Sequence, residues 1–336
     1  MTRKAVLLIL AIAAVVLLLP AAAVSLGGRS TFPTQAVTTA PPVREGEDKQ
    51  PLQIRLYRND QKKIVPIDLE EYLLGVLLAE MPSSFEKEAL KAQAVISRTY
   101  TLRRHRLYGG KGCEQAPGKA DICSDSTHCQ AWLDPESAAA GWGAEGEAFL
   151  ERVKEAVAET AGEVASYRGE PIEAVYHSTC GGRTEASYAL WDGGELPYLQ
   201  SVSCPYCKHS PHYRKNIMIP YADLAKAFSQ DFPLPVASGE TPPLKVAAET
   251  PGGRVAALSI NGATVEGKEL RRLLDLPSTA LTWEIKDEGL LLHTRGRGHG
   301  VGLCQYGADG AAREGKNYRQ IIAFYYPGCK VTGIGP

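Results

Sequence analysis

The chain has 336 residues, of which 44% are hydrophobic and 22% are charged. This is the composition of a globular protein, and it excludes a disordered chain, collagen and a coiled coil. Basic and acidic side chains number 37 and 38, so no excess of cations is present to neutralise phosphates and we expect no nucleic-acid partner. Eight cysteines are too few for a disulfide scaffold but enough for a metal site and one or two bridges.

The amino terminus predicts where the protein works. Residues 1–26 carry Arg3 and Lys4, followed by an uncharged apolar run from Ala5 to Val24. A helix of this length spans about 30 Å, so we expect a single-pass anchor (a signal-anchor) in the cell membrane. Because positive charges stay in the cytoplasm, everything after the anchor is expected to be extracytoplasmic. A signal peptide cleaved near residues 21–23 is the alternative.

Residues 27–51 are rich in Pro, Thr, Gly and charged side chains, which predicts a flexible linker. The folded domain is therefore expected over residues 52–336. Strands are predicted at 52–56, 63–67, near 164, and at 172–177, 245–260 and 283–293. A capping-box pattern that begins at Asp68 predicts a helix over 68–78, and a second such pattern, from Ser83 to Glu86, predicts another long helix. Further helices are predicted at 144–160, at 308–314 and before Pro327. Helices and strands mix without regular βαβ alternation, so we predict an α+β fold with mostly antiparallel strands.

Glu80 follows the first predicted helix and has apolar neighbours within residues 77–82. Desolvation of a carboxyl favours its protonated form, which can donate a proton to a leaving oxygen. An exposed Glu at a helix end is the ordinary alternative. On the next helix, Lys91 and Arg98 lie two turns apart on nearly one face, so we expect them to offer cations to a polar ligand such as a sugar chain.

Four potential metal ligands, Cys113, Cys123, His128 and Cys129, lie within seventeen residues of irregular sequence. Thiolates and an imidazole in a loop suit tetrahedral zinc, so we expect a structural Zn²⁺ here and no organic cofactor. A Cys113–Cys123 disulfide and buried free thiols are the alternatives.

The remaining cysteines leave their pairing open. The spacing of Cys204 and Cys207 resembles a redox motif, but no thioredoxin-like βαβ context accompanies it. A bridge from one of them to Cys180, and another from Cys304 to Cys329, are both compatible with the sequence.

Glycines alternate along residues 296–302 in the pattern Gly-x-Gly-x-Gly-x-Gly. This spacing differs from the dinucleotide fingerprint and lacks a βαβ unit, so it does not predict nucleotide binding. A segment without side chains lets a bulky ligand or another backbone approach closely. His299 and Gln305 would then be placed to hydrogen-bond a sugar hydroxyl or acetamido group.

Four blocks of sequence, in order, resemble the stage II sporulation protein D family. They are Ala-Glu-Met-Pro at 79–82 continued by 88–100, Asp-Ser-Thr-His-Cys-Gln at 125–130, Tyr-His-Ser-Thr-Cys-Gly-Gly-Arg-Thr-Glu at 176–185, and 296–308 around the alternating glycines. The similarity extends from about residue 52 to the end of the chain, and four ordered blocks are far more specific than one.

The resemblance implies a peptidoglycan lytic transglycosylase of sporulation (engulfment). Such enzymes cut glycan strands stripped of stem peptides, between N-acetylmuramic acid and N-acetylglucosamine. The family's single catalytic acid corresponds to Glu80. The segment Tyr176, His177, Ser178 and Thr179 would line the glycan groove together with His299 and Gln305.

The resemblance also implies zinc ligands and partners. Some members of the family bind zinc through residues that match Cys123, His128 and Cys129. Their further histidine has no counterpart before Cys123, so Cys113, His105 or water remains as the fourth ligand. The implied partners are an amidase, stage II sporulation protein P, and a membrane scaffold, protein M. The alternative function is that of a non-catalytic, wall-binding activator of a peptidoglycan amidase.

Overall fold

The computed structural model describes residues 51–116, 119–229, 244–260 and 262–334. The predicted anchor at 1–26 and nearly all of the predicted linker at 27–51 lie outside these ranges. Among the helices that are described, none has both the length and the apolar character required to cross a membrane.

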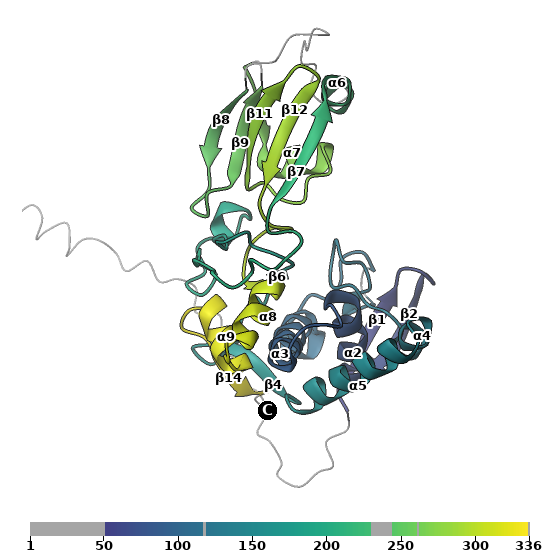
Figure 1. Cartoon of the computed structure of the whole chain (residues 1–336). Coiled ribbons are helices and arrows are strands. Elements are labelled where there is room, and N and C mark those ends of the chain that lie inside the picture. The colour runs from purple at the N-terminus through teal and green to yellow at the C-terminus, as the bar shows by residue number, and fades with distance from the viewer. Residues whose placement is uncertain (1–50, 117–118, 230–243, 261, 335–336) are drawn as a thin grey trace, which may run out of the picture. The chain divides into compact units, whose positions relative to one another are not determined.

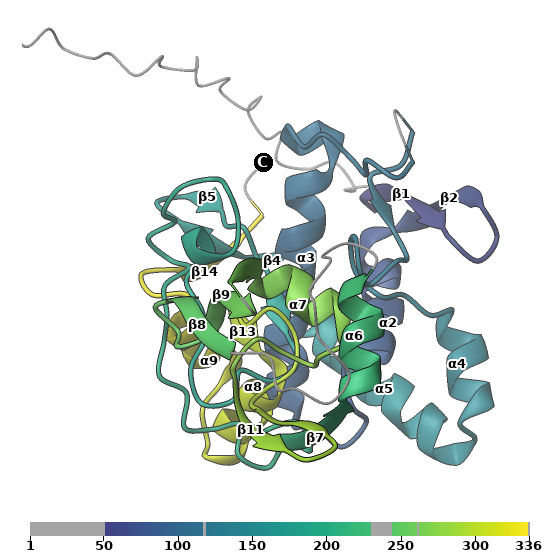
Figure 2. The same cartoon turned by 90° about the horizontal axis from the view of Figure 1, so that it is seen from above.

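Helix α3 (Lys87–Arg104) is the centre of the first hydrophobic core (Figures 1 and 2). Thirteen of its eighteen residues are buried, so neighbours surround the helix instead of covering one stripe. Its neighbours are α2 (Leu69–Glu80), α5 (Ala144–Ala158), α8 (Gln305–Arg313) and α9 (Tyr318–Tyr325), and α4 (Pro135–Gly141) packs against α2 and α5.

Short sheets complete this first part. Strand β1 (Gln53–Arg58) pairs antiparallel with β2 (Lys63–Asp68) and parallel with β3 (Ile122–Cys123). Strand β4 (Glu163–Tyr167) lies between β5 (Glu170–Pro171) and β14 (Lys330–Gly333), antiparallel to both. Strands β6 (Tyr176–His177) and β13 (Leu303–Cys304) form a parallel pair. Single 3-10 turns occur at Arg106–Tyr108 and Ser187–Ala189.

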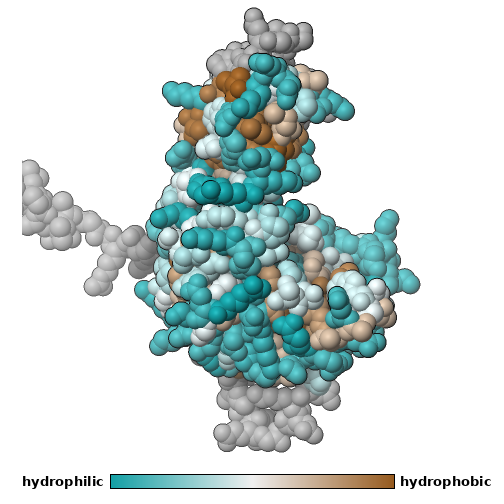
Figure 3. Space-filling view, viewed as in Figure 1, coloured by the Kyte–Doolittle hydropathy of each residue, from teal (hydrophilic) through white to brown (hydrophobic). Residues whose placement is uncertain are grey.

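A second hydrophobic core is built from residues between 215 and 294. One antiparallel sheet has the order β10-β9-β8 and the other has the order β11-β12-β7. The elements are β7 (Lys215–Pro220), α6 (Tyr221–Ser229), β8 (Leu244–Glu249), β9 (Val255–Ile260), β10 (Ala263–Glu266), α7 (Gly267–Leu273), β11 (Leu281–Lys286) and β12 (Gly289–Thr294). Figure 3 shows that the strongest apolar colouring on this face of the molecule gathers over these elements.

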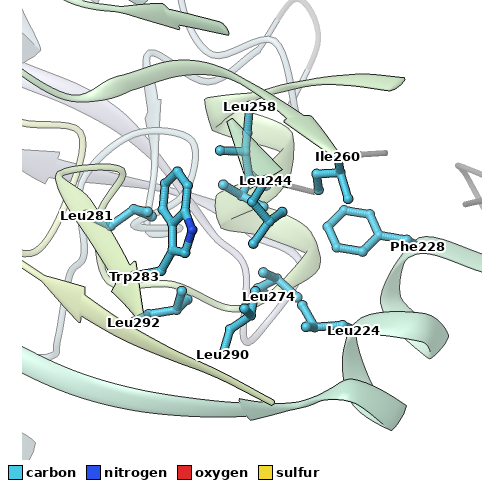
Figure 4. Close-up of a pocket in the computed structure, with 11 residues that line it drawn as sticks. Leu224, Phe228, Leu244, Leu258, Ile260, Leu274, Leu281, Trp283, Leu290 and Leu292 are labelled. Carbon is cyan, nitrogen blue, oxygen red and sulfur yellow. The ribbon is translucent and has the colours of Figure 1, made fainter. Parts of the chain in front are cut away.

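Figure 4 shows a space inside the second core into which leucines, Ile260, Phe228 and Trp283 point. Every side chain that lines it is a member of the second core or packs against it. A ligand site needs a few convergent polar groups to orient its ligand, and this lining supplies only the Trp283 indole. We therefore treat this space as part of the core and not as the functional site.

The α+β prediction and the mainly antiparallel pairing are confirmed. Asp68 caps α2, since its carboxylate accepts from the backbone N–H groups of Glu70 and Glu71. The predicted cap at Ser83 is wrong, because α3 begins at Lys87 and Glu86 makes no side-chain cap. Instead the buried carboxylate of Asp309, on α8, accepts from the backbone N–H of Glu86 at 2.8 Å.

Candidate active-site groove

An open groove with a volume of about 1000 Å³ lies beside the carboxyl end of α2. This is the upper end of the usual range for small-ligand sites, about 300–1,000 Å³, so the groove can hold a large ligand. Six of the residues predicted from the sequence line it together: Glu80, Tyr176, His177, Ser178, His299 and Gln305. Although these residues come from three distant parts of the sequence, the structure brings them to one surface.

Glu80 is the last residue of α2, and its side chain is partly buried. The backbone N–H of Ala131 donates a hydrogen bond to its Oε1 atom at 2.9 Å, which fixes the orientation of the carboxyl. Burial raises the pKa of Glu80, and the bond from Ala131 together with interactions from Tyr176 and Gln305 opposes part of that rise. The net effect favours a protonated carboxyl, which is the form a general acid requires.

A buried polar network holds Tyr176 beside Glu80. The Gln130 amide donates to the Tyr72 hydroxyl and to Thr101 Oγ1, both at 3.1 Å. Its carbonyl oxygen accepts from the Tyr176 hydroxyl at 3.2 Å. Because Gln130 directly precedes Ala131, one short segment positions both the tyrosine and the backbone donor that contact the acid.

His299 lines the groove, but both of its ring nitrogens are bonded to backbone. Its Nε2–H donates to the Tyr176 carbonyl oxygen at 2.9 Å, and its Nδ1 accepts from Val301 N–H at 3.1 Å. Burial lowers the pKa of His299 to about 4. The ring also lies 5.2 Å, centroid to centroid, from Trp191. His299 therefore has no ring nitrogen left for a sugar, and its ring connects the backbone at Tyr176 to that at Val301.

His177 is arranged differently. Its Nδ1–H donates to the Val301 carbonyl oxygen at 3.1 Å. Its Nε2 is buried and finds no hydrogen-bond partner in the described part of the chain. Burial lowers the pKa of His177, and the nearby His299 and Arg254 act in the same direction. The neutral ring therefore has one unused acceptor next to the groove.

The alternating glycines bring a backbone, not a ligand, into close approach. A Cβ on Gly302 would lie 2.0 Å from the Val175 carbonyl oxygen, and one on Gly298 would lie 2.9 Å from the His177 Cβ. Both glycines have positive φ angles, +72° and +101°. Glycine thus allows the 296–302 segment to pack directly against the segment that carries Tyr176 and His177.

Three predicted ligand-binding residues do not line the groove. Thr179 is fully buried, and its hydroxyl bonds to Ser210 Oγ at 2.7 Å. Arg98 is fully buried and pairs with Glu70. Lys91 pairs with Glu88 at 2.9 Å and with Glu159 at 2.7 Å. Sharing a helix face with Arg98 therefore does not bring Lys91 to the groove, because α3 is enclosed by its neighbours.

Sequence reasoning missed several groove residues. Trp191 is 44% exposed, and a tryptophan two residues before the Gly193–Gly194 pair was the available sequence signal. Glu173 and Asp192 add carboxylates, and Glu173 pairs with Arg103 at 3.1 Å and Arg104 at 3.5 Å. Arg271 and Arg297 also line the groove. These residues lie in segments without helical or alternating periodicity, so no pattern connected them with Glu80.

The predicted zinc ligands lie close together, and two of them, His128 and Cys129, also line the groove. The His128 Nδ1 atom lies 3.5 Å from Cys113 Sγ, 3.4 Å from Cys123 Sγ and 3.3 Å from Cys129 Sγ. The Cys129 and Cys113 sulfurs are 4.0 Å apart. A hydrogen bond from the Cys129 thiol lowers the pKa of Cys123.

This donor set fits zinc. Tetrahedral zinc with Zn–S near 2.3 Å and Zn–N near 2.0 Å separates its donors by about 3.8 Å (S to S) and about 3.5 Å (S to N). Of the candidates for the fourth ligand, Cys113 lies with the other three. His105 does not, since its Nε2 contacts the Gln53 carbonyl oxygen and its Nδ1 accepts from Leu107 N–H.

Comparisons with known proteins show the family of this chain. The sequence model of the family described as SpoIID, Stage II sporulation protein, matches residues 57–167. Stage II sporulation protein D of Bacillus subtilis (strain 168) is 36% identical over 299 residues, which cover 88% of this chain and 84% of that protein. The chain belongs to the stage II sporulation protein D family.

A second member of the family, from Bacillus amyloliquefaciens, is 34% identical over 286 residues, covering 84% of this chain and 80% of that protein. A Bacillus subtilis (strain 168) protein named amidase enhancer is 27% identical over 312 residues, covering 77% of this chain and 40% of that protein. The part matched by the family model includes Glu80 and the Cys113–Cys129 ligand set. This chain is thus a sporulation-family protein with a groove built around Glu80.

Proposed function

We propose that this protein is a lytic transglycosylase that cleaves peptidoglycan glycan strands during sporulation, with Glu80 as its acid and base. The observation that carries the proposal is a groove-lining carboxyl whose pKa burial raises and whose orientation a backbone N–H fixes. The open groove and its exposed Trp191 suit a sugar chain, because apolar sugar faces stack on aromatic rings.

One carboxyl is sufficient for this reaction. Protonated Glu80 gives its proton to the glycosidic oxygen between N-acetylmuramic acid and N-acetylglucosamine, and the bond from that oxygen to the muramic C1 breaks. The Glu80 carboxylate then takes the proton from the 6-hydroxyl of the same muramic residue, and that oxygen bonds to C1. The product is a 1,6-anhydro end, no water is consumed, and Glu80 is protonated again.

The neighbouring groups are assigned roles from their contacts. Tyr176 and Gln305 interact with the carboxylate form of Glu80, which stabilises it after the first proton transfer. The unused Nε2 of His177 accepts a hydrogen bond from a sugar hydroxyl or acetamido N–H. Ser178 is a further hydroxyl at the groove, and His299 keeps Tyr176 in place.

We propose that Cys113, Cys123, His128 and Cys129 hold a structural Zn²⁺. Four protein ligands leave no open position for water or substrate, so the ion would brace the loop that carries the groove residues Ser126 to Cys129. Chelation should therefore lower activity slowly, as the loop loosens, and should lower the melting temperature at the same time. If the metal activated water instead, activity would be lost in proportion to the ion removed, while the protein was still folded.

We also propose that the enzyme acts outside the cell membrane, held by the apolar segment at residues 1–26. Its proposed partners are the amidase and the scaffold implied by the family resemblance, stage II sporulation protein P and protein M. An amidase supplies glycan without stem peptides, which is the substrate proposed here.

A second candidate function is activation of a peptidoglycan amidase without glycan cleavage. It is favoured by the similarity to the protein named amidase enhancer, which extends over 77% of this chain. Adding the protein to an amidase on intact peptidoglycan separates the two functions. If the protein is an activator, its wild-type and Glu80→Gln forms stimulate peptide release equally well, and neither form yields anhydro ends from glycan strands alone.

A further inference from the structure

Four other cysteines, far apart in the sequence, meet in the first core. Their sulfur atoms all lie within 4.8 Å of one another, and all four residues are buried. The set is Cys180, Cys204, Cys207 and Cys304. The predicted zinc ligands Cys113, Cys123, His128 and Cys129 are called the Cys113 cluster below. The two sets together contain seven of the eight cysteines, and Cys329 belongs to neither.

The spacing of these sulfurs suits one metal ion at their centre. Tetrahedral Zn²⁺ with four thiolates separates them by about 3.8 Å, given a Zn–S distance near 2.3 Å. The Cys180 and Cys207 sulfurs are 3.4 Å apart, and no pair exceeds 4.8 Å. The Cys204-x-x-Cys207 turn supplies two ligands from one loop, as is usual in zinc sites, and two distant segments supply the others.

Two of the sulfurs, those of Cys304 and Cys204, have neighbouring groups that can donate hydrogen bonds to a thiolate, although Cys304 Sγ also lies 3.7 Å from the Ser178 carbonyl oxygen. Cys304 Sγ accepts from the backbone N–H of Cys180 and from that of Gly307, both at 3.2 Å. The Tyr325 hydroxyl lies 3.1 Å from Cys204 Sγ. Gly307 is needed here, because a Cβ would lie 2.0 Å from the Tyr325 oxygen and 2.9 Å from Cys204 Sγ. Donors that bond to a ligand atom, and not to the metal, orient and stabilise metal ligands.

A buried cation lies next to the cluster. Arg254 is 1% exposed, and its Nη2 donates to the Cys180 carbonyl oxygen at 3.1 Å. Its Nε and Nη1 atoms have no hydrogen-bond partner in the part of the chain that the structure describes. Its nearest carboxylate, Glu185, is 4.0 Å away. Four thiolates around Zn²⁺ carry a net charge of −2, so a guanidinium at this position would complement a loaded site.

We infer that Cys180, Cys204, Cys207 and Cys304 form a second structural zinc site, separate from the Cys113 cluster. Two disulfides are the competing arrangement, because the compartment proposed for this domain is oxidising. The backbone and hydroxyl donors favour the metal, since they are directed at sulfur atoms that would be much weaker acceptors in a disulfide. The ion would join the end of the Tyr176–Thr179 segment to the start of α8, where Gln305 follows Cys304.

Zinc stoichiometry of the full-length chain, purified without chelators or reductant, tests the inference. We expect two zinc ions per chain for wild type, one for Cys113→Ser/Cys123→Ser, one for Cys204→Ser/Cys207→Ser, and two for the control Cys329→Ser. One ion in wild type that persists in Cys204→Ser/Cys207→Ser would overturn the inference, as would iron in place of zinc.

A second measurement on wild type does not depend on folded variants. The protein is denatured in a zinc chelator without reductant, alkylated and mapped by mass spectrometry. We expect the peptides containing Cys180, Cys204, Cys207 and Cys304 to be alkylated. Disulfide-linked peptides among these four would refute the site. Neither measurement uses glycan cleavage. The zinc site can therefore be refuted while the proposed function stands, and the proposed function can be refuted while the zinc site stands.

Discussion

Replacing Arg98 by Met tests whether this side chain supports the fold or binds glycan. The guanidinium is fully buried. Its Nε donates to the Glu70 carboxylate at 2.8 Å, and its Nη2 donates to the same carboxylate. Its Nη1 donates to the Glu163 carbonyl oxygen at 3.1 Å. Removing one partner of a buried ion pair costs about 3–5 kcal/mol. Because the Glu70 side chain is 34% exposed, water can solvate the remaining carboxylate, and we expect the lower end, about 3 kcal/mol.

The assay is thermal and urea unfolding followed by circular dichroism. For a domain of this size, each kcal/mol of lost stability lowers the melting temperature by about 2–4 °C, so Arg98→Met should lower it by about 6–12 °C. The control Lys91→Met removes pairs whose acidic partners are about a third to a half exposed and should cost no more than about 1 kcal/mol. Folded Arg98→Met protein should bind glycan as wild type does. Unchanged stability with weakened glycan binding would refute the structural role.

Further predictions concern the glycine segment, the aromatic side chain of the groove and the acid. Gly302→Ala should destabilise the protein by about 3 kcal/mol, because its Cβ would clash with a backbone carbonyl and its φ is positive. The control Gly315→Ala has φ +80° but open space around it, so it should cost about 1 kcal/mol. Equal losses of stability in urea unfolding would contradict this. Trp191→Ala should raise KM for glycan strands about 3- to 10-fold with kcat nearly unchanged, and a loss confined to kcat would contradict a stacking role. Because burial raises the pKa of Glu80, its folded form binds the proton more tightly than the unfolded chain. The protein should therefore lose stability as pH rises from the ordinary value of 4.5 through the raised pKa. Glu80→Gln should then be more stable than wild type at neutral pH, with the difference vanishing below about pH 4.5, and a pH-independent difference would argue against the raised pKa.

Local signals predicted the elements whose boundaries depend on nearby residues. The Asp68 cap and the two strand-like segments of the first hairpin place α2 and β1–β2 within one or two residues of where they lie. The start of α3 was not predictable in this way. Its capping carboxylate belongs to Asp309, which is 223 residues away from Glu86 in the chain.

The site was predictable in part, for a similar reason. The blocks that resemble the family identified Glu80 and most of the predicted residues that line the groove. The helical period correctly placed Arg98 and Lys91 on one helix but could not show that α3 is surrounded, because that depends on tertiary packing. The four-cysteine cluster was missed because its members come from three distant segments and only one pair has a recognisable spacing.

The central claim is that Glu80 transfers the proton that breaks the glycosidic bond. It is tested most directly by mass spectrometry of the products formed from glycan strands without stem peptides, with wild type beside Glu80→Gln, and with Asp192→Asn as a control for another carboxylate that lines the same groove. The account predicts 1,6-anhydro ends from wild type and from Asp192→Asn. It predicts none from Glu80→Gln, although the melting temperature of this variant should equal or exceed that of wild type. Anhydro ends at the wild-type rate from Glu80→Gln would contradict it.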